Sequence, residues 1–151
     1  MKLVIPELAH VSTMMTWFDS EQAVQDWAGP HFTYPYDQER FVTGLQLDKL
    51  TSFALLTEQG KLVGFGQYYL RLGRCHLGRL VVTPCQRGQG VASTLLTQLS
   101  ELGKADLAVS ECSLFVLAHN DAARKAYAKF GFIEEAYPEP LPLENCLYMV
   151  R

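Results

Sequence analysis

The sequence predicts a single mixed α+β domain with αβα layering, in which helices cover a central sheet. Residues 52–82 read as three successive strands joined by tight turns, which predicts antiparallel pairing. Residues 77–119 read as a strand, a helix and a second strand, which predicts a parallel pair. The chain has 151 residues and is 48% hydrophobic, enough for one domain with a real core.

The first 50 residues are predicted to form a helical lid after a short strand at residues 2–5. Pro6 suits the start of a helix whose apolar residues follow at helical spacing. Asp19 or Ser20 is the expected cap of a second helix, and Asp37 that of a third. The apolar residues of these three helices are Leu8, Val11, Met14, Met15, Phe18, Val24, Trp27, Phe41 and Leu45.

The sheet is expected to begin with a hairpin of strands at residues 52–57 and 61–72. Gly64 and Gly66 fall on one face of the longer strand, and we expect that face to be open. A third strand at residues 77–82 ends before Pro84, because proline cannot donate to a sheet ladder.

A glycine-rich turn and an amphipathic helix follow this third strand. The turn is Gln86-Arg87-Gly88-Gln89-Gly90, and the helix begins near Val91. Its predicted apolar stripe is Val91, Leu95, Leu99 and Leu102. After it we expect a strand at 112–119, a helix at 121–130, a strand at 132–137 and a last strand at 146–150.

This strand, turn and helix have the chemistry of an anion cradle. The free N–H groups and dipole of a helix N-terminus suit a pyrophosphate, and glycines let the backbone approach a ligand closely. A dinucleotide-binding turn needs a third glycine where Ser93 stands, and the Gly-Lys-Ser/Thr ending of a P-loop is absent. A nucleotide-binding module is therefore disfavoured.

Two motifs resemble the GNAT N-acetyltransferases. Arg87-x-x-Gly90-x-Ala92 is similar to the family's acyl-CoA signature, Gln/Arg-x-x-Gly-x-Gly/Ala. About thirty residues later, Asn120 is followed by Tyr127 and then by Gly131-Phe132, which resembles the family's second block. The specific resemblance covers about residues 52–137, with residues 145–151 as the last strand.

The resemblance implies a GNAT acyl-CoA N-acyltransferase fold, a mixed central sheet whose two parallel strands splay apart around acetyl-CoA. It implies that Leu80 donates a backbone N–H to the thioester oxygen and that Tyr127 is the general acid. The residues expected to bind the cosubstrate are Val81, Val82, Arg87, Gly88, Gln89, Gly90, Val91, Ala92, Asn120 and Arg124. The expected reaction is direct attack of a primary amine on acetyl-CoA in a ternary complex.

The sequence leaves several candidates for the general base and for the acceptor substrate. The strand at residues 77–82 holds no carboxylate, so His76, Glu111, His119 and a water relay are all candidates. Trp27, His31, Tyr34 and Tyr36 are expected to line the acceptor pocket, although packing of the lid explains Trp27 equally well. A small amine, an amino acid, an antibiotic or a protein N-terminus fits, and the acidic total charge mildly favours a cationic acceptor.

Composition excludes several other classes. The net charge of −3 without a long charge run argues against nucleic-acid binding, and no apolar run approaches a membrane span. The N-terminus lacks the apolar core of a signal peptide, so we expect a cytoplasmic protein, monomer or homodimer. Cys75, Cys85, Cys112 and Cys146 lack zinc-site spacing, and we expect buried reduced thiols and no metal. A non-catalytic acyl-CoA sensor on the same fold is the alternative to the enzyme.

Overall fold

The computed structural model describes residues 1–29 and 32–151, and in them a seven-stranded mixed sheet has the order β1-β2-β3-β4-β5-β7-β6. The strands are β1 (Lys2–Val4), β2 (Thr51–Leu56), β3 (Leu62–Arg71), β4 (Arg74–Val82), β5 (Cys112–Leu117), β6 (Ile133–Glu134) and β7 (Cys146–Val150). The helices are α1 (Leu8–Met15), α2 (Glu21–Ala28), α3 (Gln38–Leu45), α4 (Val91–Leu107) and α5 (Asp121–Phe130), with a short 3₁₀ turn at Pro84–Gln86. His31, one of the expected acceptor residues, lies outside the described residues.

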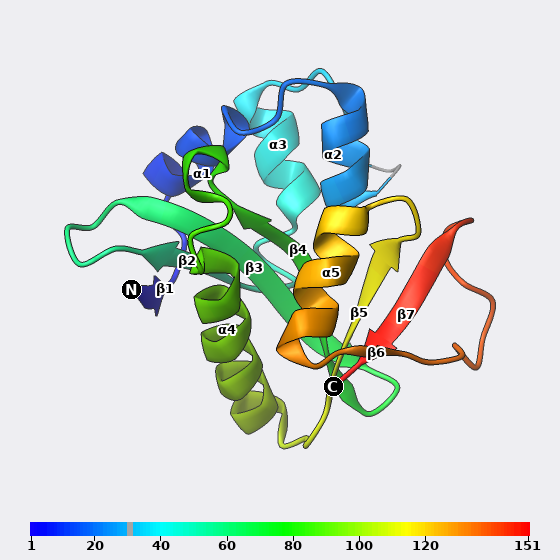
Figure 1. Ribbon diagram of the computed structural model, residues 1–151. Coiled ribbons are helices and arrows are strands. Elements are labelled where there is room, and N and C mark those ends of the chain that lie inside the picture. Colours follow the sequence, from blue (N-terminus) through cyan, green and yellow to red (C-terminus); the bar gives the residue numbers. More distant parts are fainter. Residues whose placement is uncertain (30–31) are drawn as a thin grey trace.

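The sheet divides between β4 and β5. Every neighbouring pair of strands is antiparallel except this one, which is parallel and covers only Cys75–Leu77 against Cys112–Leu114. Beyond Leu77 the two strands separate, while β5 stays paired with β7 as far as Leu117. Figure 1 shows the two strands diverging beneath α5. The expected mixed sheet with splayed parallel strands is confirmed.

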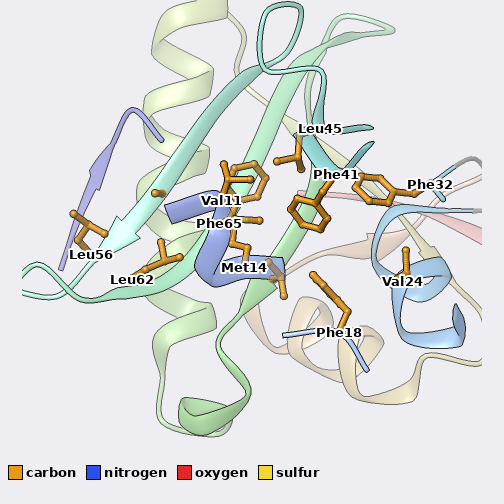
Figure 2. Packing of buried hydrophobic residues seen from close by; sticks show 12 residues of the cluster. Val11, Met14, Phe18, Val24, Phe32, Phe41, Leu45, Leu56, Leu62 and Phe65 are labelled. Atoms are coloured by element: carbon orange, nitrogen blue, oxygen red, sulfur yellow. The ribbon is translucent and has the colours of Figure 1, made fainter. Parts of the chain in front are cut away.

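Helices α1, α2 and α3 pack on the first half of the sheet. Ser20 and Asp37 cap α2 and α3 with their side chains, as expected. The buried residues of the three helices converge on Phe65 of β3, as Figure 2 shows for Met14, Phe41 and their neighbours. This cluster fixes the lid against the strands that precede the β4–β5 gap.

Helices α4 and α5 cover the other face of the sheet (Figure 1). Leu95, Leu96 and Leu99 of α4 are buried there, while Leu102 is 37% exposed, so its place in the predicted stripe was wrong. Gly103 takes that place: a Cβ atom added to it would lie 2.5 Å from Cys75 Sγ. The expectation of an open face at Gly66 was also wrong, since a Cβ there would lie 2.6 Å from Leu99 Cδ2.

Other differences from the sequence prediction are local. Strand β4 begins at Arg74, three residues before the predicted start, because the β3–β4 hairpin pairs as far as Arg71 with Arg74. Strand β6 is only Ile133–Glu134 instead of 132–137. Three of the four cysteines are buried and reduced, but Cys85 is exposed in the 3₁₀ turn. Helix α5 and strand β7 have the predicted bounds.

Candidate active site

The separation of β4 and β5 opens a cleft of about 1520 Å³. Residues of both splayed strands line it, together with residues of α2, the N-terminus of α4, and α5. The cleft therefore joins the face of the sheet covered by α4 and α5 to the face covered by the lid. A two-substrate reaction needs such an arrangement, with one substrate reaching the gap from each face.

The glycine-rich turn forms one end of the cleft. Gly88 and Gly90 have φ values of +81° and +82°, a conformation that glycine adopts without strain, and a Cβ at either position would meet nothing within 4 Å. Arg87, Gly88, Gly90 and Ala92 line the cleft, whereas Gln89 does not and Val91 is buried in the core beneath.

The N-terminus of α4 is left without a side-chain cap. Ser20, Asp37 and Asn120 accept hydrogen bonds from the first turns of α2, α3 and α5, but Gly90 at the start of α4 supplies no such acceptor. The first-turn N–H groups of a 17-residue helix are thus available at the cleft. This open cradle fits the pyrophosphate of coenzyme A.

The edge of β4 that faces the gap presents unpaired backbone. The register with β3 slips at Arg79 and Leu80, and Arg79 has a φ of +49°, so the strand carries a bulge there. Thr83 donates its N–H to Val63 O on the β3 side. Because N–H groups alternate along a strand, the N–H of Val82 points into the gap. Leu80, Val81 and Val82 all line the cleft.

Tyr127 reaches the cleft from α5 on the opposite side of the gap. Its ring packs edge-on against Phe132, and no hydrogen bond to its hydroxyl occurs within residues 1–29 and 32–151. Burial raises the pKa of Tyr127 to about 12, so the phenol stays protonated at neutral pH. A protonated hydroxyl that faces a cleft is placed to donate to a ligand.

Asn120 and Arg124 differ in how they relate to the cleft. Asn120 lines it and caps α5, with Oδ1 accepting from Ala123 N–H at 3.3 Å, so its amide nitrogen is left to donate to a ligand. Arg124 does not line the cleft. It donates to Ala118 O at 3.1 Å and to Glu134 Oε1 at 3.0 Å, and so fastens the start of α5 to β6.

His76 is buried in the sheet, with only 2% of its surface exposed. Its Nδ1 and Ser113 Oγ share a hydrogen bond of 2.8 Å across the β4–β5 pair, and its ring packs 4.6 Å from that of Phe115. Burial and the nearby Arg71 cation lower the pKa of His76 to about 3. The imidazole touches the cleft but is a weak proton acceptor there.

The aromatic residues of the lid mostly pack against each other. Trp27 lines the cleft, stacks on Phe18 at 4.4 Å and donates Nε1–H to Arg79 O at 2.8 Å. Tyr34 and Tyr36 lie outside the cleft in the lid core, and Tyr36 donates its hydroxyl to Met15 O at 2.7 Å. Of Trp27, Tyr34 and Tyr36, the described residues of the predicted acceptor pocket, Trp27 alone lines the cleft.

Three residues that line the lid side of the cleft were not predicted to bind substrate: Gln67, Tyr69 and Arg79. Gln67 donates to Leu45 O and Ser52 Oγ, at 2.6 and 2.9 Å, and so joins α3 to β2. Their signal in the sequence was a polar side chain within an otherwise apolar strand. Gln67 and Tyr69 also follow Phe65 at every second position, which puts all three side chains on the same face of the strand.

A contact between two distant segments lies beside the cleft. His119 Nε2 and Asp26 Oδ1 are 2.8 Å apart, which joins the end of β5 to α2. Within the described ranges, no group of three histidine, cysteine or acidic residues could hold a metal ion. In those same ranges, no helix combines the length and apolar character of a membrane span.

Comparison with solved structures supports the same fold. Aminoglycoside acetyltransferase AAC(6')-Ib with coenzyme A and kanamycin is 19% identical, with a TM-score of 0.75 over 99% of this chain and 93% of that one. Spermidine N-acetyltransferase from Vibrio cholerae, with CoA and spermine, is 18% identical, with a TM-score of 0.72 over 99% and 94%. PaiA N-acetyltransferase from Thermoplasma acidophilum, with coenzyme A, is 18% identical, with a TM-score of 0.71 over 99% and 97%.

The sequence comparison covers most of the site described above. The profile of the Acetyltransferase (GNAT) family matches residues 21–132, which include α2, the bulge of β4, the glycine-rich cradle and Tyr127. With the splayed sheet and the fold of its structural neighbours, this match shows that the chain belongs to the GNAT family of acetyltransferases.

Proposed function

We propose that this protein is an N-acetyltransferase that moves the acetyl group of acetyl-CoA to a primary amine. The observation that carries the proposal is one cleft that contains an uncapped helix N-terminus, unpaired strand backbone and a protonated tyrosine. Each of these groups matches a different part of an acyl-CoA thioester: the pyrophosphate, the amide-rich arm and the leaving sulfur.

The cosubstrate is proposed to lie on the α4 and α5 side of the gap. Backbone N–H groups of residues 87–92 would hold the pyrophosphate, and Arg87 would add a charge-assisted hydrogen bond. The pantetheine arm would pair with Val81 and Val82 like an added strand, since β5 leaves this edge of β4 free. The Asn120 amide nitrogen would donate to the same arm, since Asn120 lines the cleft and uses only Oδ1 to cap α5.

The proposed reaction is a direct transfer. The amine nitrogen forms a bond to the thioester carbonyl carbon, the C–S bond breaks, and the nitrogen loses one proton. Leu80 N–H stabilises negative charge on the carbonyl oxygen, and Tyr127 donates its proton to the departing thiolate. Tyr127 regains a proton from solvent. The products are therefore the acetylated amine and free coenzyme A thiol, and the enzyme returns to its starting state.

We propose that solvent removes the proton from the amine, because none of the base candidates named above is well placed to do so within residues 1–29 and 32–151. His76 has a lowered pKa and a hydrogen bond to Ser113, and β4 contains no carboxylate. Neither Glu111, which pairs with Arg74, nor His119, which contacts Asp26, lines the cleft. An α-amino group, with a pKa near 8, loses its proton more readily than a lysine amine near 10.4.

The decisive experiment compares wild-type protein with Tyr127→Phe in a thiol-release assay with acetyl-CoA and a panel of amines. Loss of the general acid should lower kcat by about 10²-fold or more while acetyl-CoA affinity stays unchanged. Tyr68→Phe is the matched control, since the Tyr68 hydroxyl is bonded to Asp106 outside the cleft. Tight binding of acetyl-CoA with no turnover on any amine would instead establish a sensor.

A further inference from the structure

Arg79 is a cation in the cleft, and no carboxylate of the described residues pairs with it. Burial lowers the pKa of Arg79, partly offset by the Tyr69 phenol, which shows that the protein does not fully replace the water this charge has lost. A partly buried charge without a partner is costly to maintain for packing alone.

Most of the donors of Arg79 are unused. Nη1 donates to Gly44 O at the C-terminal end of α3 and lies 3.5 Å from Gln67 Oε1. A guanidinium has five N–H groups, and the hydrogen bonds of the described residues engage Nη1 alone. The carbonyl contact fixes the side chain against the lid, over the ring of Phe32, and leaves Nε and Nη2 for a ligand.

The other charged residues near the cleft do not neutralise Arg79. Arg71 does not line the cleft and is held between the rings of Tyr69 and Phe115, where it donates Nε–H to Tyr69 Oη at 3.2 Å. Asp26, the acidic residue of α2 that lines the cleft, is engaged by His119. Asp19 also lines the cleft but is exposed.

We infer that the acceptor is an amine that also bears a carboxylate, and that Arg79 binds this carboxylate as a specificity-determining residue. The inference rests on the proposed acetyl transfer and names its substrate class. Arg79 immediately precedes Leu80, the proposed donor to the thioester oxygen, so their Cα atoms are about 3.8 Å apart. Both residues line the same cleft, so a carboxylate bound to Arg79 keeps the amino group of the same small molecule within that cleft, as an amino acid would require. A guanidinium binds a carboxylate with two parallel hydrogen bonds.

This substrate class differs from that of the structural neighbours. The neighbours described above hold spermine and kanamycin, which carry several amino groups. A polycation in this cleft would meet the Arg79 cation on the lid side, where the acidic lining consists of Asp26, hydrogen-bonded to His119, and the exposed Asp19. The local charge thus argues against the cationic acceptor that the total charge of −3 suggests.

The test uses matched acceptors with the intact protein and acetyl-CoA. Each amino acid of the standard set is compared with its carboxamide and its decarboxylated amine, and spermidine and kanamycin complete the panel. Rates are corrected for the deprotonated fraction of each amine. We expect kcat/KM to be at least tenfold higher for the carboxylate form of the preferred acceptor. Equal rates for the three forms, or a preference for a polycation, would overturn the inference.

Arg79→Gln separates carboxylate binding from a structural role. Loss of the lid contact alone would slow every acceptor equally, whereas loss of the anion site should lower kcat/KM for the amino acid at least tenfold more than for its decarboxylated amine. Arg79→Lys should recover part of the preference. Arg74→Gln is the control, because Arg74 pairs with Glu111 and Glu135 outside the cleft. An unchanged preference in Arg79→Gln would contradict the inference.

Binding of the amino acid to the protein–CoA complex, measured by calorimetry, keeps the two proposals apart. Binding that needs Arg79, without turnover on any amine, would refute the acetyl transfer and retain the anion site. Turnover of amines that does not depend on a carboxylate would support the acetyl transfer and refute the anion site at Arg79. If Arg79→Gln does not fold, the comparison of each amino acid with its carboxamide and its decarboxylated amine in the wild-type protein still tests whether the acceptor must carry a carboxylate.

Discussion

Arg79 illustrates why a residue of this site can stand out in the sequence although its role cannot be predicted from the sequence. The polar side chain is conspicuous within an apolar strand. Its role depends on the bulge and on a positive φ that a non-glycine residue adopts at a cost of about 1–3 kcal/mol. That backbone turns the guanidinium toward Gly44 of α3, 35 residues earlier, and no local pattern encodes such a contact.

His76 should make the protein less stable in acid. The unfolded chain binds a proton at this residue below its ordinary pKa near 6.5, while the folded protein does so only near 3. The stabilising contribution is complete above pH 6.5 and is lost as the pH falls from there toward 3. Between pH 7.5 and 5.5 the free energy of unfolding should fall by about 1 kcal/mol more in wild-type protein than in His76→Gln. Urea unfolding at both pH values measures this, and an equal fall in the two proteins would contradict it.

The same residue should matter little for proton removal. A buried imidazole bonded to Ser113 gives a weak base, so His76→Ala should lose less than about a hundredfold in kcat/KM, the lower range for loss of a general base. The measurement is made near pH 8, where stability is not limiting, with folding checked by circular dichroism. A larger loss, restored by added imidazole, would identify His76 as the base after all.

At the scale of elements, sequence patterns predicted the features that residues close in sequence determine, such as the ends of a capped helix. The bounds of α5 follow from the Asn120 cap and the positive φ of Gly131, both legible in sequence. The predicted start of β4 and both predicted bounds of β6 were wrong because the length of a strand depends on how far the neighbouring strand pairs with it. The stripe of α4 failed at Leu102 because the helix lies so close to β4 that a glycine, not a leucine, faces the sheet.

Gly103→Ala should therefore destabilise the protein, although alanine normally favours a helix over glycine by about 1 kcal/mol. The new methyl group would lie 2.5 Å from Cys75 Sγ and 3.2 Å from Tyr68 Cγ, which forces α4 away from the sheet. We expect a loss of about 1–3 kcal/mol in the free energy of unfolding. Denaturant unfolding measures it.

Cys75→Ala provides the control for this substitution. Removing the sulfur atom opens space for the methyl group, so the double variant should be more stable than the sum of the two single effects predicts. A coupling of at least about 0.5 kcal/mol is expected for residues in contact. Additive effects, or a Gly103→Ala protein that is more stable than wild type, would show that α4 moves freely over the sheet.

At the scale of the whole molecule, the site exists because the sheet is interrupted between β4 and β5. One hydrophobic cluster joins the lid to β2, β3 and β4, and a second joins α4 and α5 to β3, β4, β5 and β7, so the second cluster spans the interruption. Between β4 and β5 only three residue pairs bridge the sheet. The sequence predicted a parallel strand pair, but its splaying was implied only by the resemblance to the family, because divergence of strands has no local signature.

Coenzyme A should fill this break in the sheet, and amide exchange can locate it residue by residue. The N–H of Val82 points into the gap, whereas Thr83 donates to Val63 and Val81 pairs with Phe65 on the β3 side. Saturating coenzyme A should therefore slow exchange at Val82, and at Leu80, by at least about tenfold, while Val81 and Thr83 change only by the general stabilisation that ligand binding brings. Measurement by NMR with and without coenzyme A provides this comparison within a single strand. Equal protection of all four amides would mean that the ligand stabilises the fold without pairing to β4, and no protection of Val82 would place the cosubstrate elsewhere in the cleft.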